Sequence, residues 1–209
     1  MFLPGTFGMA EDYVPEMSAL APRRCVAVSL RGRGRSDVPE LGYSFEDHVR
    51  DFDTIVAESG LDRFCLMAYS MGAAYAIGYA ARNAARLAGL IIGDYPARYR
   101  ALAPAWVGRA LTALPDRAKP AVARALQRES SEVVLWERLA EIRCPVLILR
   151  GGQAGVLVTD EIAAMYRRHL TRARLVTLPA AGHELWQPDF DAYVGAVRSF
   201  VEQLDAAAN

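Results

Sequence analysis

The chain has 209 residues, of which 53% are hydrophobic and 23% charged, and its 24 basic and 24 acidic residues give a formal net charge of +0. This length suits one domain with a small insertion, and the composition is that of a globular protein with a substantial core. A neutral chain with dispersed charges has no field that attracts nucleic acid or an anionic membrane, so neither is expected as a partner.

Three cysteines, at positions 25, 65 and 144, each begin an apolar run. An odd number of cysteines in strand-like contexts favours buried free thiols and a reducing compartment, and their spacing does not match a metal site. No stretch approaches the length of a membrane-spanning helix, and the first residues lack the basic and apolar regions of a signal peptide. We therefore expect a cytoplasmic protein that uses no metal or other cofactor.

Apolar runs that resemble strands alternate with helical patterns along the chain. The expected strands are 25–30, 64–69, 87–92, 146–149 and 175–178, and the expected helices are 10–20, 44–59, 71–82, 160–170 and 190–204. Such alternation predicts a parallel sheet covered by helices on both faces. Ligands of such sheets bind beyond the C-terminal ends of the strands, so the turns that follow strands are where chemistry is expected.

The segment 96–141 breaks this alternation, because no strand is expected in it. Four apolar residues at a spacing of four form one helical face: Leu102, Trp106, Ala110 and Leu114. Two serines at 130–131, followed by an apolar run at 133–136, indicate the start of a second helix. The insertion lies between two sheet strands on the ligand side, which predicts a helical lid at about 97–140. The alternative is a helical decoration that only covers the sheet.

The strand FCLMAY (64–69) leads directly into Ser70, Met71 and Gly72. The pattern A-Y-S-M-G is close to G-x-S-x-G, a sharp strand-to-helix turn that holds a serine in a strained conformation with its hydroxyl clear of the sheet. Ala68 and Gly72 supply the small residues that the turn requires. The helix behind the serine points its N-terminal amides at this position and favours negative charge there.

The sequence contains three histidines, and one of them follows a strand. His183 lies in the turn AAGHE, after the last expected strand and before the last helix, so it belongs at the same sheet edge as Ser70. His48 and His169 fall within helical patterns and are expected to be surface or packing residues. We therefore predict that His183 is the general base for Ser70.

Two further turns are rich in glycine. The loop LPGTFG (3–8) follows a short apolar start, and its backbone amides are candidates to stabilise an oxyanion beside the serine. The turn RGRGRSD (31–37) lacks the spacing of a phosphate-binding loop. We expect it to be a tight turn with solvated arginines.

These motifs resemble the α/β-hydrolase superfamily over nearly the whole chain. LPGTFGMAEDYVP is similar to the oxyanion loop of that family, RGRGRSDVPE to the turn after its next strand, AYSMG to its nucleophile elbow and AGHELWQPDF to its histidine turn. The resemblance implies an α/β fold with a small lid in one domain, 1–209, and a catalytic triad in the order serine, acid, histidine. It implies that Ser70 is the nucleophile, that His183 is the general base, and that the backbone amides of Met71 and Thr6 form the oxyanion hole.

The sequence departs from the family in three places. It has Pro4-Gly5 where the family usually has His-Gly, and it lacks the two strands that normally precede this loop. The mostly parallel sheet is therefore expected to have about six strands, with the strand 25–30 at an exposed edge that is a candidate surface for a homodimer. The third departure is the turn after the strand 146–149, where the family acid would occupy 154–155 and this chain has alanine and glycine.

Two acidic residues are alternatives for the missing acid. Asp94 closes the strand that follows the elbow helix, in the same layer as Ser70, and some family members place the acid there. Asp160 resembles a helix cap, and many members have an aspartate at the position of Asp94 only as a turn residue. We favour Asp94 over Asp160, and either over a site without an acid.

The leading hypothesis is a hydrolase, similar to carboxylic ester hydrolases, that acts through Ser70 on a small ester, thioester, lactone or C–C bond next to a carbonyl. The expected partner is thus a small-molecule substrate. Candidates for the walls of an apolar substrate pocket are Tyr69, Trp106, Trp136 and Trp186, and candidates to meet a substrate carboxylate are Arg31, Arg98 and Arg100.

Two alternatives stay open, and the lack of an acid at 154–155 motivates both. One is a lyase or cyclase that uses the pocket and oxyanion hole of the same fold without a covalent intermediate. The other is a non-catalytic member that binds a ligand, although such a protein has no need for both Ser70 and His183.

Overall fold

A parallel sheet of five strands forms the centre of the molecule in our computed structural model, which describes residues 1–207. The strands are β1 (Phe2–Leu3), β2 (Phe64–Tyr69), β3 (Leu87–Gly93), β6 (Val146–Gly151) and β7 (Arg174–Leu178), in the spatial order β1-β2-β3-β6-β7. Every pairing in this sheet is parallel. The long apolar runs of β2, β3 and β6 follow from this arrangement, because the central strands of a parallel sheet are covered on both faces.

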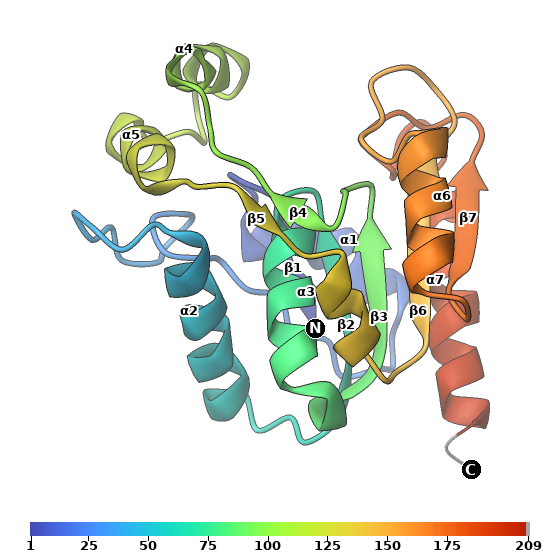
Figure 1. The fold of residues 1–209 in the computed structure, drawn as a ribbon. Helices are drawn as coiled ribbons and strands as arrows, with labels where there is room; N and C mark the ends of the chain where they lie inside the picture. The colour runs from blue at the N-terminus through green and yellow to red at the C-terminus, as the bar shows by residue number, and fades with distance from the viewer. Residues whose placement is uncertain (208–209) are drawn as a thin grey trace.

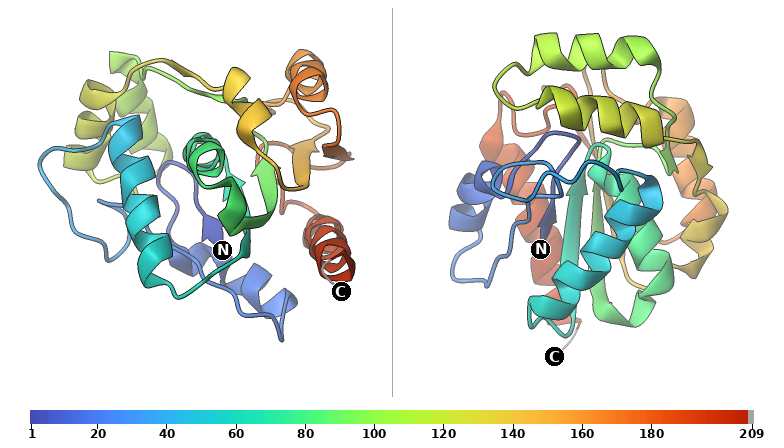
Figure 2. Two further views of the ribbon diagram at one scale, coloured as in Figure 1. Left: turned by 60° about the horizontal axis from the view of Figure 1, so that its bottom comes forward. Right: turned by 90° about the vertical axis from the view of Figure 1, so that its left-hand side faces the viewer.

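Helices cover both faces of the sheet (Figures 1 and 2). One face packs against α2 (Phe45–Glu58), α3 (Gly72–Arg82), η3 (Glu137–Glu141) and α6 (Asp160–His169). The other packs against η1 (Ala10–Tyr13), α1 (Val14–Ala19) and α7 (Phe190–Ala206). Side chains alternate between the two faces along β2, since Leu66 and Ala68 belong to the first core and Met67 to the second.

The expected strands and helices that flank the motifs are confirmed within a few residues. The strand at 64–69 has the expected bounds, and α3 begins one residue later than expected. The expected helix 10–20 is divided into η1 and the short helix α1.

The expected strand at 25–30 is wrong. Only Ala27 pairs with the sheet, through an isolated bridge to Phe2, with hydrogen bonds from Phe2 N to Val26 O (2.8 Å) and from Val28 N to Phe2 O (3.3 Å). The reason is that β1 has only two residues, so it offers too short an edge for a full neighbouring strand. The main sheet therefore has five strands instead of about six, and a homodimer through this edge stays a prediction.

The segment 97–140 contains two helices and a small second sheet. The helices are α4 (Pro104–Ala113) and α5 (Pro120–Glu129), and the sheet pairs β4 (Arg98–Tyr99) with β5 (Val133–Val134) in antiparallel orientation. The expectation of no strand here was wrong, as was the expected helix start at 130–131. The β-branched Val133 and Val134 favour a strand, and Ser130 Oγ accepts a hydrogen bond from Leu102 N (2.8 Å) instead of capping a helix.

Figure 1 places α4 and α5 beyond the end of the sheet to which the arrowheads of β3 and β7 point. This is the C-terminal edge of the strands. The two helices pack against Phe7 and Tyr43, which come from the loops that follow β1 and precede α2. The arrangement brings the 97–140 segment to the same side of the molecule as the turns that follow β2 and β3.

Candidate active site

Ser70 lies in a strained turn between β2 and α3. Its φ angle is 51°, in the left-handed region that residues other than glycine rarely adopt. Gly72 is required because a Cβ atom at this position would overlap the carbonyl oxygen of Pro4. A Cβ atom on Gly5 would lie 3.1 Å from the Ser70 Cβ. The loop 3–8 is therefore packed directly against the serine.

His183 connects Ser70 to Asp94 through its two ring nitrogens. Its Nε2 lies 3.0 Å from Ser70 Oγ, and its Nδ1 lies 2.7 Å from Asp94 Oδ2. A carboxylate only accepts hydrogen bonds, so Nδ1 carries the proton and Nε2 is left as an acceptor for the serine hydroxyl. Tyr69 Oη donates to the backbone oxygen of His183 at 3.0 Å and so holds the histidine loop against the elbow.

Asp94 is fully buried, and its carboxylate accepts three hydrogen bonds. Oδ1 accepts a hydrogen bond from Val158 N and Oδ2 one from Leu157 N, both at 2.9 Å, in addition to the His183 contact. Three donors compensate the cost of removing an ionised carboxylate from water. The φ angle of Asp94 is 42°, a conformation in which aspartate and asparagine are several-fold enriched.

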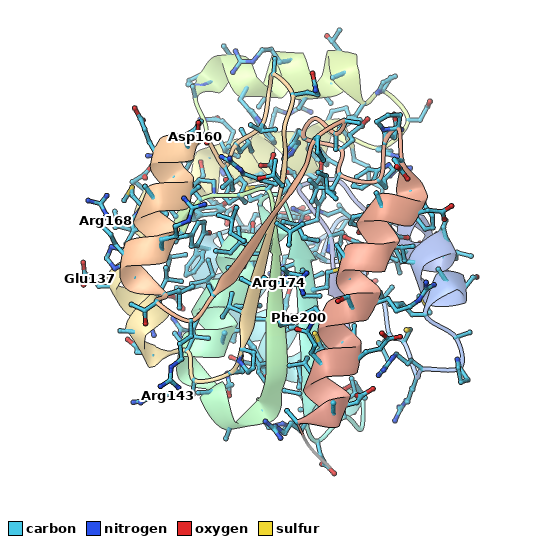
Figure 3. The ribbon with its side chains drawn as sticks, turned by 90° about the vertical axis from the view of Figure 1, so that its right-hand side faces the viewer. Glu137, Arg143, Asp160, Arg168, Arg174 and Phe200 are labelled. Atoms are coloured by element: carbon cyan, nitrogen blue, oxygen red, sulfur yellow. The ribbon has the colours of Figure 1, made fainter. Side chains whose placement is uncertain are left out.

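Asp160, the other candidate for the acid, lies on the outer surface at the N-terminal end of α6 (Figure 3). Its side chain is 92% exposed and forms an ion pair with Arg150 at 2.7 Å. The helix cap is Thr159, whose side chain accepts a hydrogen bond from Ile162 N, and not Asp160 as expected. Of the two acids, only Asp94 contacts His183.

The glycine turn after β6 packs against the histidine loop. A Cβ atom on Gly151 would overlap the backbone oxygens of Ala181 and Gly182, and one on Gly152 would lie 2.8 Å from Pro179 O. Gln153 N donates to Ala181 O at 3.0 Å. The two backbones approach so closely that this turn holds the His183 loop in place without supplying an acid.

A cavity of about 640 Å³ opens beside these residues. Ser70, His183, Tyr69 and Trp186 line it together with residues 4–8 of the glycine loop, which include Thr6. Met71 is buried behind the serine at the start of α3. The expected serine, histidine, oxyanion loop and two of the four expected aromatic residues therefore meet at one cavity.

The other two expected pocket aromatics lie elsewhere. Trp136 belongs to the core, where its ring packs against Tyr166 and His169 with centroid distances of 4.9 and 5.7 Å. It follows β5, where the chain turns back to cover the sheet. Trp106 stacks on Phe7 at 5.7 Å, and Phe7, not Trp106, lines the cavity.

The arginines expected at the mouth of the site are also placed elsewhere. Arg31 pairs with Asp51 on α2, and Arg98 lies 4.0 Å from Glu132. None of the residues Arg31, Arg98 and Arg100 lines the cavity.

Sequence reasoning missed four charged residues that do line the cavity: Asp12, Glu16, Arg117 and Glu184. Arg117 Nη1 bonds to Asp12 Oδ2 at 2.6 Å and so links the segment after α4 to η1. Asp12 and Glu16 lie within the expected helix next to the oxyanion loop. This proximity in sequence is the one feature that could have indicated that they line the cavity.

Two classes of feature are absent from the part of the chain that the structure describes. Within residues 1–207, no three His, Cys, Asp or Glu side chains are grouped so that they could ligate a metal ion. No helix within the same residues has the length and apolar composition needed to cross a membrane.

Comparison with known families agrees with the fold and the order of the motifs. Residues 1–196 match a family model described as the alpha/beta hydrolase family. The chain therefore belongs to the α/β-hydrolase family. The parallel sheet, the strained turn after β2 and the histidine turn after β7 are its shared architecture.

Two curated relatives are similar over most of this chain. N-formylmaleamate deformylase of Pseudomonas putida is 27% identical over 209 residues, which cover 84% of this chain and 77% of the relative. A haloalkane dehalogenase of Bradyrhizobium diazoefficiens is 24% identical, and the match covers 93% of this chain and 83% of the relative. Both relatives are hydrolytic enzymes, which supports a hydrolase.

Solved structures share the fold at lower identity. E-2-(acetamidomethylene)succinate hydrolase superposes with a TM-score of 0.77 at 21% identity, and covers 96% of this chain and 90% of its own. An esterase from Rhodococcus sp. has a TM-score of 0.81 at 21% identity, and the superposition covers 97% of this chain and 90% of the esterase.

Proposed function

We propose that the protein is a serine hydrolase that cleaves a small acyl compound. The observation that carries this proposal is the pair of contacts from His183 to Ser70 (3.0 Å) and to Asp94 (2.7 Å) beside a cavity. A nucleophile bonded to a base that is oriented by a third group is the arrangement that activates a serine. The bond that is cleaved is that of an ester, thioester or lactone, or a C–C bond beside a carbonyl. The similarity to N-formylmaleamate deformylase and to E-2-(acetamidomethylene)succinate hydrolase adds an amide bond to these candidates.

The first half of the reaction forms an acyl-enzyme. Ser70 Oγ attacks the substrate carbonyl carbon while its proton moves to His183 Nε2, and the carbonyl electrons move onto the oxygen. Backbone N–H groups of Thr6 and Met71 stabilise this oxyanion, and Asp94 stabilises the imidazolium through Nδ1–H. The tetrahedral intermediate collapses, and His183 returns the proton to the leaving group.

The second half repeats these steps with water. His183 Nε2 takes a proton from the water as its oxygen attacks the acyl carbon. When the second tetrahedral intermediate collapses, the bond to Ser70 Oγ breaks, His183 returns the proton to Oγ, and the carboxylic acid is released. Because Asp94 is buried and bonded to two backbone amides, it stays in position through both halves.

We also propose that residues 97–140 act as a lid over the cavity. Leu114 and Arg117, which follow α4, line the cavity, and the bond from Arg117 to Asp12 spans from this segment to η1. A lid of this kind excludes water and shapes the pocket around the substrate.

A fluorophosphonate probe tests the proposed nucleophile without knowledge of the substrate. Intact mass spectrometry should find one probe adduct on the wild type and none on Ser70→Ala. Ser36→Ala is the matched control, because Ser36 Oγ bonds to the Ser29 carbonyl oxygen and does not line the cavity. Equal labelling of wild type and Ser70→Ala would sink the proposal, and an unlabelled wild type would favour the lyase, cyclase or binding alternatives.

A further inference from the structure

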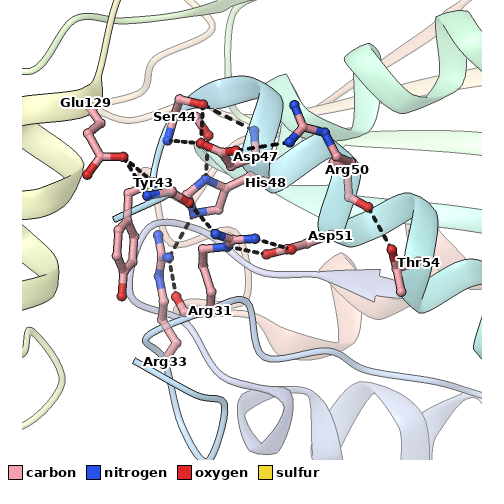
Figure 4. A network of polar contacts seen from close by, with 11 residues as sticks. Arg31, Arg33, Tyr43, Ser44, Asp47, His48, Arg50, Asp51, Thr54 and Glu129 are labelled. Carbon is pink, nitrogen blue, oxygen red and sulfur yellow. Dashed lines mark hydrogen bonds and ion pairs between the residues drawn. The ribbon is translucent and has the colours of Figure 1, made fainter. Parts of the chain in front are cut away.

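Two arginines of the turn RGRGRSD have different environments, although both were expected to be solvated. Arg31 is half-buried and forms an ion pair with Asp51 on α2. Arg33, two residues later, is only 1% exposed. Figure 4 shows both side chains beneath α2, with Arg33 next to His48. The expectation for Arg33 is therefore wrong, because the turn folds inward at this residue.

Arg33 donates hydrogen bonds to three neutral acceptors. Its Nε donates to the Thr6 carbonyl oxygen at 2.7 Å, and its Nη1 donates to the Arg31 carbonyl oxygen at 2.6 Å. Nη1 also lies 2.9 Å from His48 Nε2. His48 Nδ1 lies 2.8 Å from the Ser44 carbonyl oxygen and therefore carries the ring proton, so Nε2 is the acceptor.

The His48 ring is neutral in this environment. Burial, and after it the charge of Arg33, lowers the pKa of His48 to about 3. The ring also stacks on Tyr75 at a centroid distance of 4.6 Å and an interplanar angle of 3°. Stacking and both ring-nitrogen contacts fix the ring, and the ring in turn fixes one side of the Arg33 guanidinium.

A buried guanidinium of this kind is costly to keep. Arginine is rarely buried completely unless an acid pairs with it, because its charge loses the solvation of water. Arg33 forms no ion pair with an acid anywhere in residues 1–207. A costly charge without an acid is more easily explained by a task at the site than by a contribution to stability.

The contact that explains the cost is the bond to Thr6. The Thr6 N–H is one of the two proposed oxyanion donors, and the carbonyl of the same residue is held by Arg33. On its other side the loop is packed on the elbow through Gly5 and Gly72. Glycines on either side of Thr6, at 5 and 8, leave the loop conformationally free, so an external restraint decides where its N–H groups point.

We propose that Arg33 is a positioning residue that holds Thr6, and with it the oxyanion loop, in the conformation that receives the developing oxyanion. This inference rests on the proposed function of Ser70 and the loop. Arg33 does not line the cavity, so it acts through Thr6 and not on the substrate. Its planar fork reaches the Thr6 and Arg31 carbonyls and the His48 ring at once, which a lysine ammonium cannot reproduce.

The test compares Arg33→Gln with Arg31→Gln, which removes an equivalent guanidinium from the same turn. The readouts are the second-order rate constant of fluorophosphonate labelling, and kcat and KM for p-nitrophenyl acetate. Loss of one oxyanion donor lowers kcat by about 10²–10³-fold, and we expect this loss in both the labelling rate and kcat of Arg33→Gln, with KM almost unchanged. Arg31→Gln should keep both rates within about threefold, because the Arg31 side chain pairs with Asp51 on α2 and neither lines the cavity nor bonds to Thr6.

Two further measurements separate positioning from folding. Arg33→Lys keeps a charge at the site and should still lose about tenfold in labelling rate, because its ammonium cannot make the three contacts. Millimolar guanidinium should restore part of the labelling rate of Arg33→Ala and leave Arg31→Ala unchanged.

A folded Arg33→Gln that labels at the wild-type rate overturns the inference. If this variant does not fold, Arg33→Lys decides in its place, and a wild-type labelling rate in that variant overturns the inference as well. Failure of the proposed function is distinguishable, because it appears in chains that keep Arg33, either as equal labelling of the wild type and Ser70→Ala or as a wild type that is not labelled at all.

Discussion

The surroundings of His183 and of His48 show how one side chain type serves two tasks. Both rings are bonded at both nitrogens. His183 has a carboxylate at Nδ1 and a serine hydroxyl at Nε2, whereas His48 has a backbone carbonyl at Nδ1 and a guanidinium at Nε2. The His183 side chain is 31% exposed beside the cavity, and His48 is fully buried.

The partner of each ring decides its chemistry. A carboxylate at Nδ1 stabilises the imidazolium that forms when Nε2 takes a proton, so His183 is suited to be a base. Burial on all sides, and after it the cation at Nε2, oppose the protonation of His48, so this ring stays a fixed acceptor. The expectation that His48 is a packing residue agrees with this environment, although the sequence did not indicate its contact with Arg33.

The largest expected effect is that of His183→Gln. Without the base, kcat for p-nitrophenyl acetate should fall by about 10⁴–10⁶-fold, while thermal stability changes little because the side chain is partly exposed. His48→Gln is the matched control, since a glutamine oxygen can still accept a bond from Arg33, and its kcat should stay within about tenfold of the wild type. Equal losses in the two variants would erase the distinction between the two histidines.

Asp94→Asn should have the next largest effect, with kcat about 10³–10⁴-fold lower. The amide cannot stabilise an imidazolium, and its NH₂ group favours the tautomer with the proton on Nε2. Asp160→Asn changes the exposed acid that pairs with Arg150, and steady-state kinetics should find its kcat within about twofold of the wild type. Near-normal turnover in Asp94→Asn would refute the assignment of the acid.

The dependence of stability on pH tests His48. Its pKa is about 3 in the folded chain against an ordinary value near 6.5, so between these values only the unfolded chain binds the proton. The contribution of neutral His48 to stability is fully present above about pH 6.5. As the pH falls below about 6.5, the free energy of unfolding should fall by about 1.4 kcal/mol per pH unit.

Urea unfolding of the wild type and of His48→Gln isolates this contribution from other titrating groups. Between about pH 6 and about pH 5, the free energy of unfolding should fall less steeply with pH in the variant. The difference in slope should correspond to close to one proton bound on unfolding. Parallel slopes would show that His48 is not held neutral.

The smallest expected effect is that of Tyr69→Phe. It removes the hydrogen bond from Tyr69 Oη to the backbone of His183 and leaves the ring that lines the cavity. The free energy of unfolding should fall by about 0.5–1.5 kcal/mol, the usual contribution of one such bond. Calorimetry and kcat measured together would show whether the histidine loop depends on this anchor; an unchanged stability would contradict it.

Local patterns were sufficient for much of the fold. The strand FCLMAY and the helix after it follow from apolar runs and periodicity, and these were confirmed. The predicted strand at 25–30 does not form because its partner β1 is too short, and the serines at 130–131 predict a helix start where β5 follows instead. In both cases the pairing depends on a distant segment, β1 for residues 25–30 and β4 for β5, although the β-branched Val133 and Val134 were a local signal for β5.

The sequence by itself determined the family, the order of the motifs and the positions of Ser70 and His183, because a strand, a tight turn and a helix are specified by neighbouring residues. It left Asp94 and Asp160 as alternatives. The tertiary structure decided which of them contacts His183, since that depends on the alignment of β3 with β6 and on the amides of Leu157 and Val158. It also decided that Trp136 is in the core and that Arg33 lies behind Thr6, because burial arises only when distant segments pack together.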